Sequence, residues 1–214
     1  MEETFVELRG KVIRGDRDGA RAIVDSLLEK GTDAQKIIGT SLIPAMDTVG
    51  EKFEKNEFFL PELLVAARAM ENCMEVLQPL LVKGGVKPLA TAVIGTVKGD
   101  LHDIGKNIVA AMLKGAGFEI IDLGKDVAPE KFAAEIKSRK PSLVGMSALL
   151  TTTMRAMKDT IEVIGKKGLR GDVKILVGGA PLTESYAADI GADGYAPDAA
   201  QAVRKARELL GIAQ

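Results

Sequence analysis

The sequence predicts an α/β protein in two parts: an N-terminal four-helix bundle over residues 1–83, and a doubly wound, five-stranded parallel sheet of the flavodoxin or Rossmann-like kind over residues 89–214. Three observations predict this fold class. Apolar residues of the first part recur at helical spacing, whereas short apolar runs alternate with helical stretches in the second. Between the two parts, residues 84–88 form a short Gly/Pro linker.

Four helices account for the N-terminal part. The first two carry apolar residues at helical spacing, and the second closes on Gly31, a residue typical of helix C-termini. The third is expected over 32–54 with a kink at Pro44, because proline has no backbone N–H to donate within a helix. The fourth is expected over 60–82, with Pro61 in its first turn, where proline is well tolerated.

The C-terminal part is expected to contain five strands that alternate with five helices. The strands are short apolar runs at 89–97, 118–123, 143–148, 173–177 and 193–196. The helices fill the intervals at 105–116, 129–139, 153–167, 182–190 and 198–210. Apolar strands in this alternation are typical of a parallel sheet covered on both faces, which binds its ligand beyond the carboxyl ends of the strands.

The composition excludes several classes of protein. The chain has 214 residues, of which 46% are hydrophobic, so it contains enough apolar material for a folded core. A single Cys excludes a disulfide scaffold, and a net charge of -1 gives no support for nucleic-acid binding. No apolar run is long enough to cross a membrane, and the acidic N-terminus does not resemble a signal peptide, so we expect a cytoplasmic protein.

A single histidine, His102, excludes metal sites built from several imidazoles of one chain. It lies in the segment GDLHDIGKN, between the first predicted strand and the helix that follows. Asp100 is two residues away, and a carboxylate there would decide which ring nitrogen keeps its proton and leave the other to bind a metal. Gly105 would let a large ligand approach the backbone. From the residues alone, the alternative is an ordinary loop histidine beside a helix-capping aspartate.

The spacing D-x-H-x-x-G resembles the cobalamin signature of the methionine synthase and corrinoid-protein family, and VKGDLHDIGKNIV at 97–109 matches that family over thirteen residues. Two further segments match it in the same order, SALLT at 147–151 and VGGA at 177–180. In the N-terminal part, Phe53 and the segment EFFLPE at 57–62 resemble the family's helical cap. The resemblance covers nearly the whole chain.

The resemblance implies a role for each residue of the signature loop. His102 would be the lower axial ligand of cobalt, and Asp100 would accept a hydrogen bond from its other ring nitrogen. Thr153 stands where methionine synthase has a serine that continues this chain of hydrogen bonds, and we assign it that role. The neighbouring residues of the loop would contact the cofactor: Gly99, Leu101, Asp103 and Gly105.

The resemblance also implies a slot for the displaced nucleotide tail of cobalamin. Its walls would be Ser147, Leu149 and Thr151 on one side and Gly178 and Gly179 on the other. Glycine is sensible there because a planar base needs backbone without side chains in the way. Ala199 matches a position that lines the corrinoid in the family, although an ordinary helix-start alanine is the alternative.

In the helical cap, Phe53 and Leu60 match positions that shield the cobalt-bound methyl group from water. Phe58, Phe59 and Leu63 lie beside them, and each alone is better explained as part of the bundle core. Cys73 is expected to be a small buried residue of the fourth helix and not a reactive thiol.

The function implied is that of a stand-alone corrinoid protein in a methanol-, methylamine- or aryl-ether-type methyltransferase system. The protein would be a methyl-carrying subunit and not a complete enzyme. Its cobalamin would cycle between cob(I)alamin and methylcobalamin, taking a methyl group from a substrate-specific methyltransferase and passing it to a second one that acts on tetrahydrofolate or a thiol. A reductive activator of Co(II) would be a third partner, and neither nucleic acid nor a membrane is expected.

Three alternatives share part of this pattern. An adenosylcobalamin-dependent sensor would use the same two modules, but this Trp-free chain lacks the Trp-containing motif of sensor caps and any basic helix-turn-helix. The small subunit of an adenosylcobalamin mutase shares D-x-H-x-x-G but generally lacks a cap with the Phe53 and Leu60 pattern. A flavodoxin-like response module would leave the single histidine and the ordered signatures unexplained.

Overall fold

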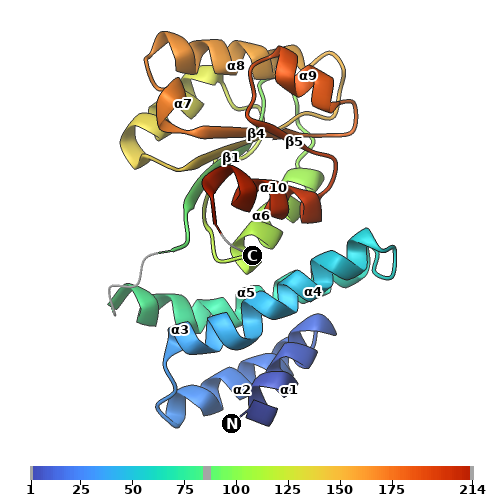
Figure 1. Cartoon of the computed structure of the whole chain (residues 1–214), viewed down its shortest axis with the longest axis vertical. Coiled ribbons are helices and arrows are strands. Elements are labelled where there is room, and N and C mark those ends of the chain that lie inside the picture. The colour runs from blue at the N-terminus through green and yellow to red at the C-terminus, as the bar shows by residue number, and fades with distance from the viewer. Residues whose placement is uncertain (1, 84–87, 213–214) are drawn as a thin grey trace. The chain divides into compact units, whose positions relative to one another are not determined.

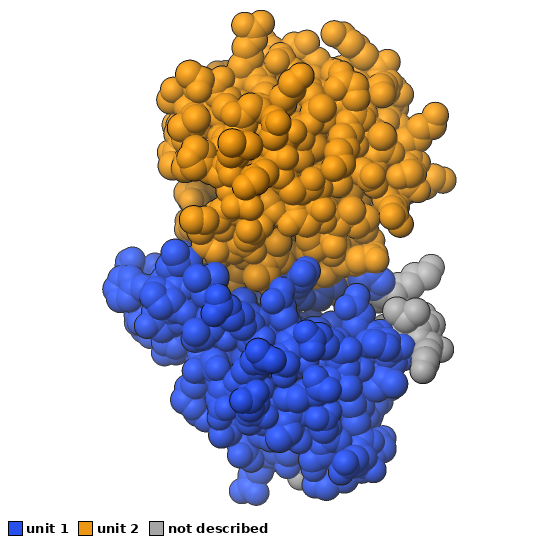
Figure 2. Space-filling model, turned by 180° about the vertical axis from the view of Figure 1, so that it is seen from behind, with its two compact units in different colours: residues 1–88, 114–117 blue, residues 89–113, 118–214 orange. Residues whose placement is uncertain are grey.

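The computed structural model describes residues 2–83 and 88–212. The chain divides into two compact units, one of residues 1–88 and 114–117, and the other of residues 89–113 and 118–214 (Figure 2). The predicted linker at 84–88 falls almost entirely outside the described residues. Among those residues, no helix is long and apolar enough to cross a membrane.

The first unit is built from helices, as predicted. They are α1 (Glu2–Ile13), α2 (Arg17–Glu29), α3 (Ala34–Ile37), a π-helical turn (Ile38–Leu42), α4 (Ile43–Glu54) and α5 (Leu60–Lys83). The third predicted helix is the rod formed by α3, the π-helical turn and α4. The core of this first unit is formed by fully buried side chains from all its long helices, among them Leu8, Val24, Leu27, Met46, Leu63, Met70 and Leu77.

The sequence predicts a kink at Pro44, and the structure has a π-helical turn just before this proline. Pro44 has no N–H to donate to the carbonyl of Thr40 one turn earlier, and the helix widens just before it. A guanidinium nitrogen of Arg9 donates to the Thr40 carbonyl at 2.9 Å instead. The helix therefore continues past the proline without leaving that carbonyl unpaired.

The second unit contains a five-stranded parallel sheet in the order β2-β1-β3-β4-β5. The strands are β1 (Thr91–Thr96), β2 (Glu119–Asp122), β3 (Leu143–Ser147), β4 (Lys174–Gly178) and β5 (Gly194–Ala196). This order is the flavodoxin-like one, so the predicted fold class is confirmed. The three central strands β1, β3 and β4 are mostly buried, whereas β2 is half-exposed because it forms an edge of the sheet.

Helices cover both faces of the sheet (Figure 1). Figure 1 shows α7 (Pro129–Arg139), α8 (Arg155–Lys166) and α9 (Glu184–Asp189) on one face, and α6 (Ile104–Gly115) and α10 (Ala199–Leu210) on the other. The first group packs on the sheet through an apolar core that includes Val93, Phe132, Ile136, Val144, Met157 and Ile164. Helix α8 begins two residues later than predicted, because residues 151–154 form a turn.

The sheet order places a switch point between β1 and β3. The chain leaves β1 toward α6 on one face and leaves β3 toward α8 on the other, so the two loops diverge and leave space between them. Ligands of open α/β sheets bind in this crevice beyond the carboxyl ends of the strands. The loop with His102 follows β1, and the segment 147–153 follows β3.

Candidate cobalamin site

The loop after β1 is folded around the side chain of Asp100. One carboxylate oxygen, Oδ1, accepts a hydrogen bond from the backbone N–H of His102 at 3.0 Å and lies 2.7 Å from Nδ1 of the same imidazole. The backbone reaches this conformation through Gly99, whose φ of 84° is one that side-chain-bearing residues rarely adopt. The loop therefore orients the ring through its own neighbour, as the spacing in the sequence predicts.

The second oxygen of Asp100 connects this loop to the one after β3. Oδ2 accepts hydrogen bonds at 2.7 Å from the hydroxyl of Thr153 and at 2.7 Å from the backbone N–H of Leu149. The Thr153 hydroxyl also lies 2.9 Å from the carbonyl oxygen of Leu150, so its single proton has two acceptors within reach. The structure thus brings His102, Asp100 and Thr153 into one continuous chain of hydrogen bonds.

Asp100 is fully buried, whereas the His102 side chain is 50% exposed. Burial by itself raises the pKa of the Asp100 carboxyl. The hydrogen bonds from Thr153, from the N–H groups of His102 and Leu149 and from the imidazole outweigh it, and together they hold that pKa well below its usual range. The carboxylate is therefore charged at neutral pH and keeps a proton on Nδ1. The other ring nitrogen, Nε2, is then free of that proton and can bind a metal.

The residues predicted to line a nucleotide slot lie at the carboxyl ends of two neighbouring strands, β3 and β4, and in the loops that follow them. Ser147 at the end of β3 is in register with Gly178 at the end of β4. Gly179 has a φ of 137°, and a Cβ there would lie 1.8 Å from the carbonyl oxygen of Ala148. The neighbouring strand therefore already requires this glycine, a different reason from the space for a planar base that the sequence suggests. Leu149 and Thr151 are both exposed on the loop that follows.

The remaining predicted residues, Ala199, Phe53 and Leu60, lie on helices outside the loop that carries His102. Ala199 is buried at the first position of α10, directly after the capping side chain of Asp198, which is also what an ordinary helix-start alanine would do. In the first unit, Phe53 is half-buried near the end of α4, and Leu60 is 40% exposed at the start of α5.

The sequence analysis explains Phe58, Phe59 and Leu63 as residues of the bundle core, and the structure bears this out for only some of them. It is confirmed for Leu63, which is fully buried. It is wrong for Phe59, which is 61% exposed because it precedes the first turn of α5, where its N–H bonds to the carboxylate of Glu62. Phe58 is half-buried, with the ammonium of Lys52 over its ring at 5.1 Å from the centroid.

Two residues that sequence reasoning missed hold the backbone of the loop. The hydroxyl of Thr96, the last residue of β1, donates to the carbonyl of His102 at 3.0 Å. The carboxylate of Asp126 accepts from the N–H of Gly99 at 2.7 Å. Thr96 was visible as a polar residue inside an apolar strand. Asp126 gave no such signal, because its loop after β2 is brought here only by the sheet order.

The site fits a large planar cofactor. A Cβ added to Gly105 would meet no protein atom within 4 Å, so nothing inside the protein itself requires glycine there. Large apolar side chains surround the loop in exposed positions, namely Leu101, Ile104, Leu149 and Leu150. The described residues contain no group of three or more His, Cys, Asp and Glu side chains that could hold a bare metal ion. A corrin ring supplies four nitrogens itself and needs only one more from the protein.

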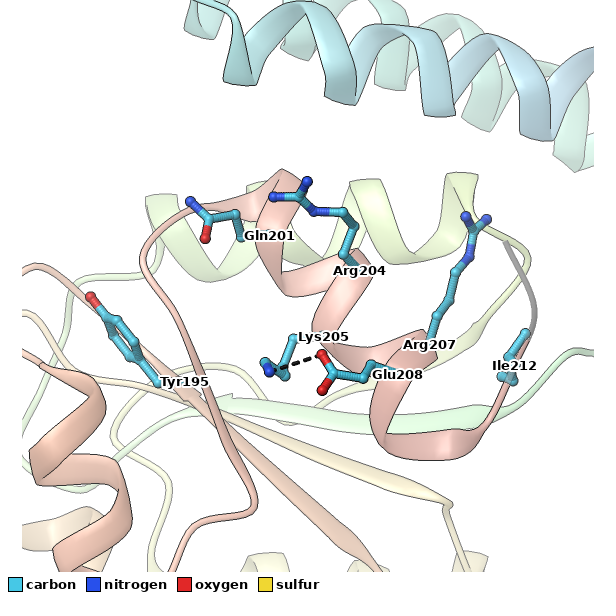
Figure 3. A pocket seen from close by; sticks show the side chains of 7 residues that line it. All are labelled: Tyr195, Gln201, Arg204, Lys205, Arg207, Glu208 and Ile212. Carbon is cyan, nitrogen blue, oxygen red and sulfur yellow. Dashed lines mark hydrogen bonds and ion pairs between the residues drawn. The ribbon is translucent and has the colours of Figure 1, made fainter.

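A separate cavity of about 400 Å³ lies along α10 (Figure 3). It is lined by Tyr195, Gln201, Arg204, Lys205, Arg207, Glu208 and Ile212, none of which is a predicted site residue. The Lys205 ammonium pairs with the Glu208 carboxylate at 2.9 Å. The cavity therefore differs from the His102 site in both its elements and its polar lining.

Comparisons with known proteins agree with this assignment. Residues 90–204 match the B12 binding domain family, and residues 5–78 match a second B12 binding domain family. Dimethylamine corrinoid protein 1 of Methanosarcina acetivorans is 44% identical over 98% of both chains.

Two solved structures are also similar. A cobalamin-binding protein from Desulfitobacterium hafniense is 32% identical with a TM-score of 0.80, covering 96% of this chain and 98% of that one. The methanol:cobalamin methyltransferase complex from Methanosarcina barkeri contains a chain that is 28% identical with a TM-score of 0.87, and the match covers 99% of this chain and 81% of that one.

These matches favour the methyl carrier over the adenosylcobalamin-dependent sensor and the mutase subunit, because the relatives are corrinoid proteins over nearly their whole length. They also establish cobalamin as the cofactor and support a methyltransferase as a partner. The chain belongs to the family of cobalamin-binding corrinoid proteins that carry methyl groups for methyltransferases.

Proposed function

We propose that His102 is the lower axial ligand through which this chain holds cobalamin while it carries a methyl group between two methyltransferases. The observation that supports this most directly is the geometry of the ring. Nδ1 lies 2.7 Å from a buried carboxylate, and the ring itself is half-exposed at the carboxyl edge of the sheet. An imidazole held in this way offers Nε2 to a metal.

When bound, the cofactor supplies a cobalt atom that takes up a methyl group as a nucleophile and gives it up again. The protein's residues provide the ligand, the proton and the cover. Because its hydrogen bonds keep Asp100 charged, this carboxylate would hold a proton on Nδ1 of His102 and leave Nε2 to hold the metal. The Thr153 hydroxyl supports that charge at 2.7 Å.

The other predicted residues have supporting roles in this proposal. Ser147, Leu149 and Thr151 face Gly178 and Gly179 across a slot for the nucleotide tail, and the short loop residues Gly99, Leu101, Asp103 and Gly105 lie against the corrin, with Ala199 at its margin. Phe53 and Leu60 of the helical cap cover the methyl group. In this proposal the chain consists of a cap domain 1–83, a linker 84–88 and a cobalamin domain 89–214.

We infer that the methyl donor is a methylated amine, bound by a separate substrate-specific methyltransferase. Support comes from the dimethylamine and trimethylamine corrinoid proteins that match over 98% of this chain at 44% and 43% identity. The acceptor is tetrahydrofolate or a thiol on a second methyltransferase, and a reductive activator restores the cofactor after oxidation to Co(II). We place these reactions in the cytoplasm.

The axial ligand can be tested by the absorption spectrum of the protein reconstituted with hydroxocobalamin. Wild type should show the spectrum of cobalt with a nitrogen ligand, and His102→Ala should show the spectrum without one. Lys137→Ala, a change at an exposed position of α7, should match wild type and serves as the control. Identical spectra for wild type and His102→Ala would remove the ligand assignment.

The donor can be tested by methylation of the reduced, cofactor-loaded protein. Methyltransferases specific for monomethylamine, dimethylamine, trimethylamine and methanol would each be supplied with their substrate, and the cofactor spectrum followed. We expect rapid methylation with one of the amine enzymes and at least about tenfold slower methylation with the methanol enzyme, a difference of about 1.4 kcal/mol in the barrier. Preference for the methanol enzyme would overturn the choice of donor while leaving the role of His102 intact.

A further inference from the structure

The backbone of His102 is held at both of its polar groups. Its N–H donates to Oδ1 of Asp100 at 3.0 Å, and its carbonyl accepts from the Thr96 hydroxyl at 3.0 Å. Thr96 is fully buried at the end of β1, so no water replaces this donor. The residue that carries the imidazole is therefore attached directly to β1, one of the buried strands of the sheet.

The other end of the same loop is held by Asp126. Its carboxylate accepts from the N–H of Gly99 at 2.7 Å, and its own N–H donates to the carbonyl of Asp100 at 3.0 Å. Asp126 does this from a φ of 54°, a left-handed conformation that is uncommon for residues other than glycine and asparagine. The bridge between Val97 and Val127 brings this loop alongside the end of β1.

The hydroxyl of Thr96 and the carboxylate of Asp126 bond to backbone groups, and neither residue belongs to the chain of His102, Asp100 and Thr153. The two side chains hold only backbone groups of the loop. A ligand residue whose backbone is already ordered loses less conformational entropy when it binds a metal than one on a loose loop. An ordered loop would therefore favour binding of the metal by His102.

We propose that Thr96 is a positioning residue for the axial ligand, and that Asp126 supports it at the opposite end of the loop. Together they keep the His102 backbone in the conformation from which Nε2 reaches cobalt, and so favour the ligand-bound form. This inference rests on the proposed role of His102 as the axial ligand.

The test compares Thr96→Val with Thr96→Ser in the full-length protein loaded with hydroxocobalamin and reduced to Co(II). Valine has the shape of threonine but lacks the hydroxyl, whereas serine keeps it. Nitrogen splitting in the electron paramagnetic resonance spectrum measures the fraction of cobalt that carries the His102 ligand, and His102→Ala supplies the reference without it. Thr96→Val should lower the ratio of ligated to unligated cobalt about fivefold, the factor that corresponds to one hydrogen bond of about 1 kcal/mol. Thr96→Ser should stay close to wild type.

A second pair of variants covers the case in which Thr96→Val does not fold. Asp126 is exposed, so its replacement does not disturb the core. Asp126→Gly keeps the left-handed backbone accessible and removes the acceptor, and it should lower the same ratio. Asp126→Asn keeps an oxygen acceptor and a residue that tolerates this conformation, and it should stay nearer to wild type.

The outcomes separate this inference from the proposed function. If wild type and His102→Ala differ but Thr96→Val and Asp126→Gly match wild type, the positioning role is overturned and the ligand assignment remains. Equal losses for Thr96→Val and Thr96→Ser would mean that the methyl group matters and the hydroxyl does not, which also overturns it. If wild type and His102→Ala do not differ, the ligand assignment fails, and the positioning role fails with it.

Discussion

Asp100 organises the site because one buried carboxylate accepts hydrogen bonds from four residues. Its two oxygens accept from the imidazole and N–H of His102, from the Thr153 hydroxyl and from the N–H groups of Leu149 and Leu150. Burial of a charge is costly unless such donors surround it. Because all of them favour the charged form, the group remains a carboxylate, and the direction of the hydrogen bond to Nδ1 follows from that charge.

Cys73 illustrates a residue whose chemistry is suppressed by its surroundings. It is fully buried in α5, as expected from the sequence, and burial raises the pKa of its thiol to about 12 from 9.0. The folded protein therefore holds the thiol protonated at pH values where the unfolded chain ionises it. Stability that depends on this group is present below pH 9.0 and is lost as the pH rises toward about 12.

We expect Cys73→Ala to lower the free energy of unfolding by about 1 kcal/mol at pH 7, because a sulfur atom is removed from a packed core. At pH 10.5 the sign of this gap should reverse, because ionisation of the thiol in the unfolded chain destabilises the wild type by about 2 kcal/mol and has no counterpart in the variant. Urea unfolding with reductant present, at both pH values, measures this difference. A gap that widens with pH would contradict the raised pKa of Cys73.

At the scale of elements, two glycines at the carboxyl edge are glycine for different reasons. Gly179 follows β4, and its Cβ position is blocked by the Ala148 carbonyl oxygen of the neighbouring strand. Gly105 lies in the first turn of α6, and its Cβ position is open. The first glycine is required by the fold, and the second is required only if a ligand occupies the space beside it.

The two substitutions should therefore separate folding from cofactor binding. Gly179→Ala should destabilise the protein without cofactor by about 3 kcal/mol or more, since the clash is with backbone and the φ of 137° is strained for alanine. Gly105→Ala should leave that stability within about 1 kcal/mol of wild type and yet weaken corrinoid binding about tenfold. Urea unfolding and a corrinoid titration of each variant supply the measurements. Normal corrinoid affinity in Gly105→Ala would show that no ligand approaches this helix turn.

The strands and helices also show which structural features the sequence patterns predict and which they miss. Apolar runs located all five strands, because a buried parallel strand must be apolar along its length. The half-exposed edge position of β2 was not visible in its run, since position in a sheet depends on the other strands. Residues 153 and 154 were assigned to a helix, although they belong to the turn at 151–154 that brings the Thr153 hydroxyl to Asp100.

For the whole molecule, a single histidine sets the stoichiometry. With only His102 available as an imidazole ligand, each chain should bind one corrinoid with a cobalt–nitrogen bond. We expect the absorbance of the reconstituted protein, after removal of unbound cofactor, to give about one corrinoid per chain. Titration of wild type should reach its spectral endpoint at the same ratio. An endpoint near two would require a second ligand of another type and would contradict the single site.

The pattern of apolar residues was sufficient to predict the fold class, and the identities and order of the motif residues were sufficient to predict the cofactor and the pairing of His102 with Asp100. These features depend on local spacing and on segments that keep their order along the chain, so they are visible in one dimension. The contacts of Thr96 and Asp126, the approach of Thr153 and the obstruction at Gly179 were decided by the parallel order β2-β1-β3-β4-β5. That order sets which loops meet at the carboxyl edge, and hydrogen bonds between loops far apart in the chain exist only once the sheet has formed.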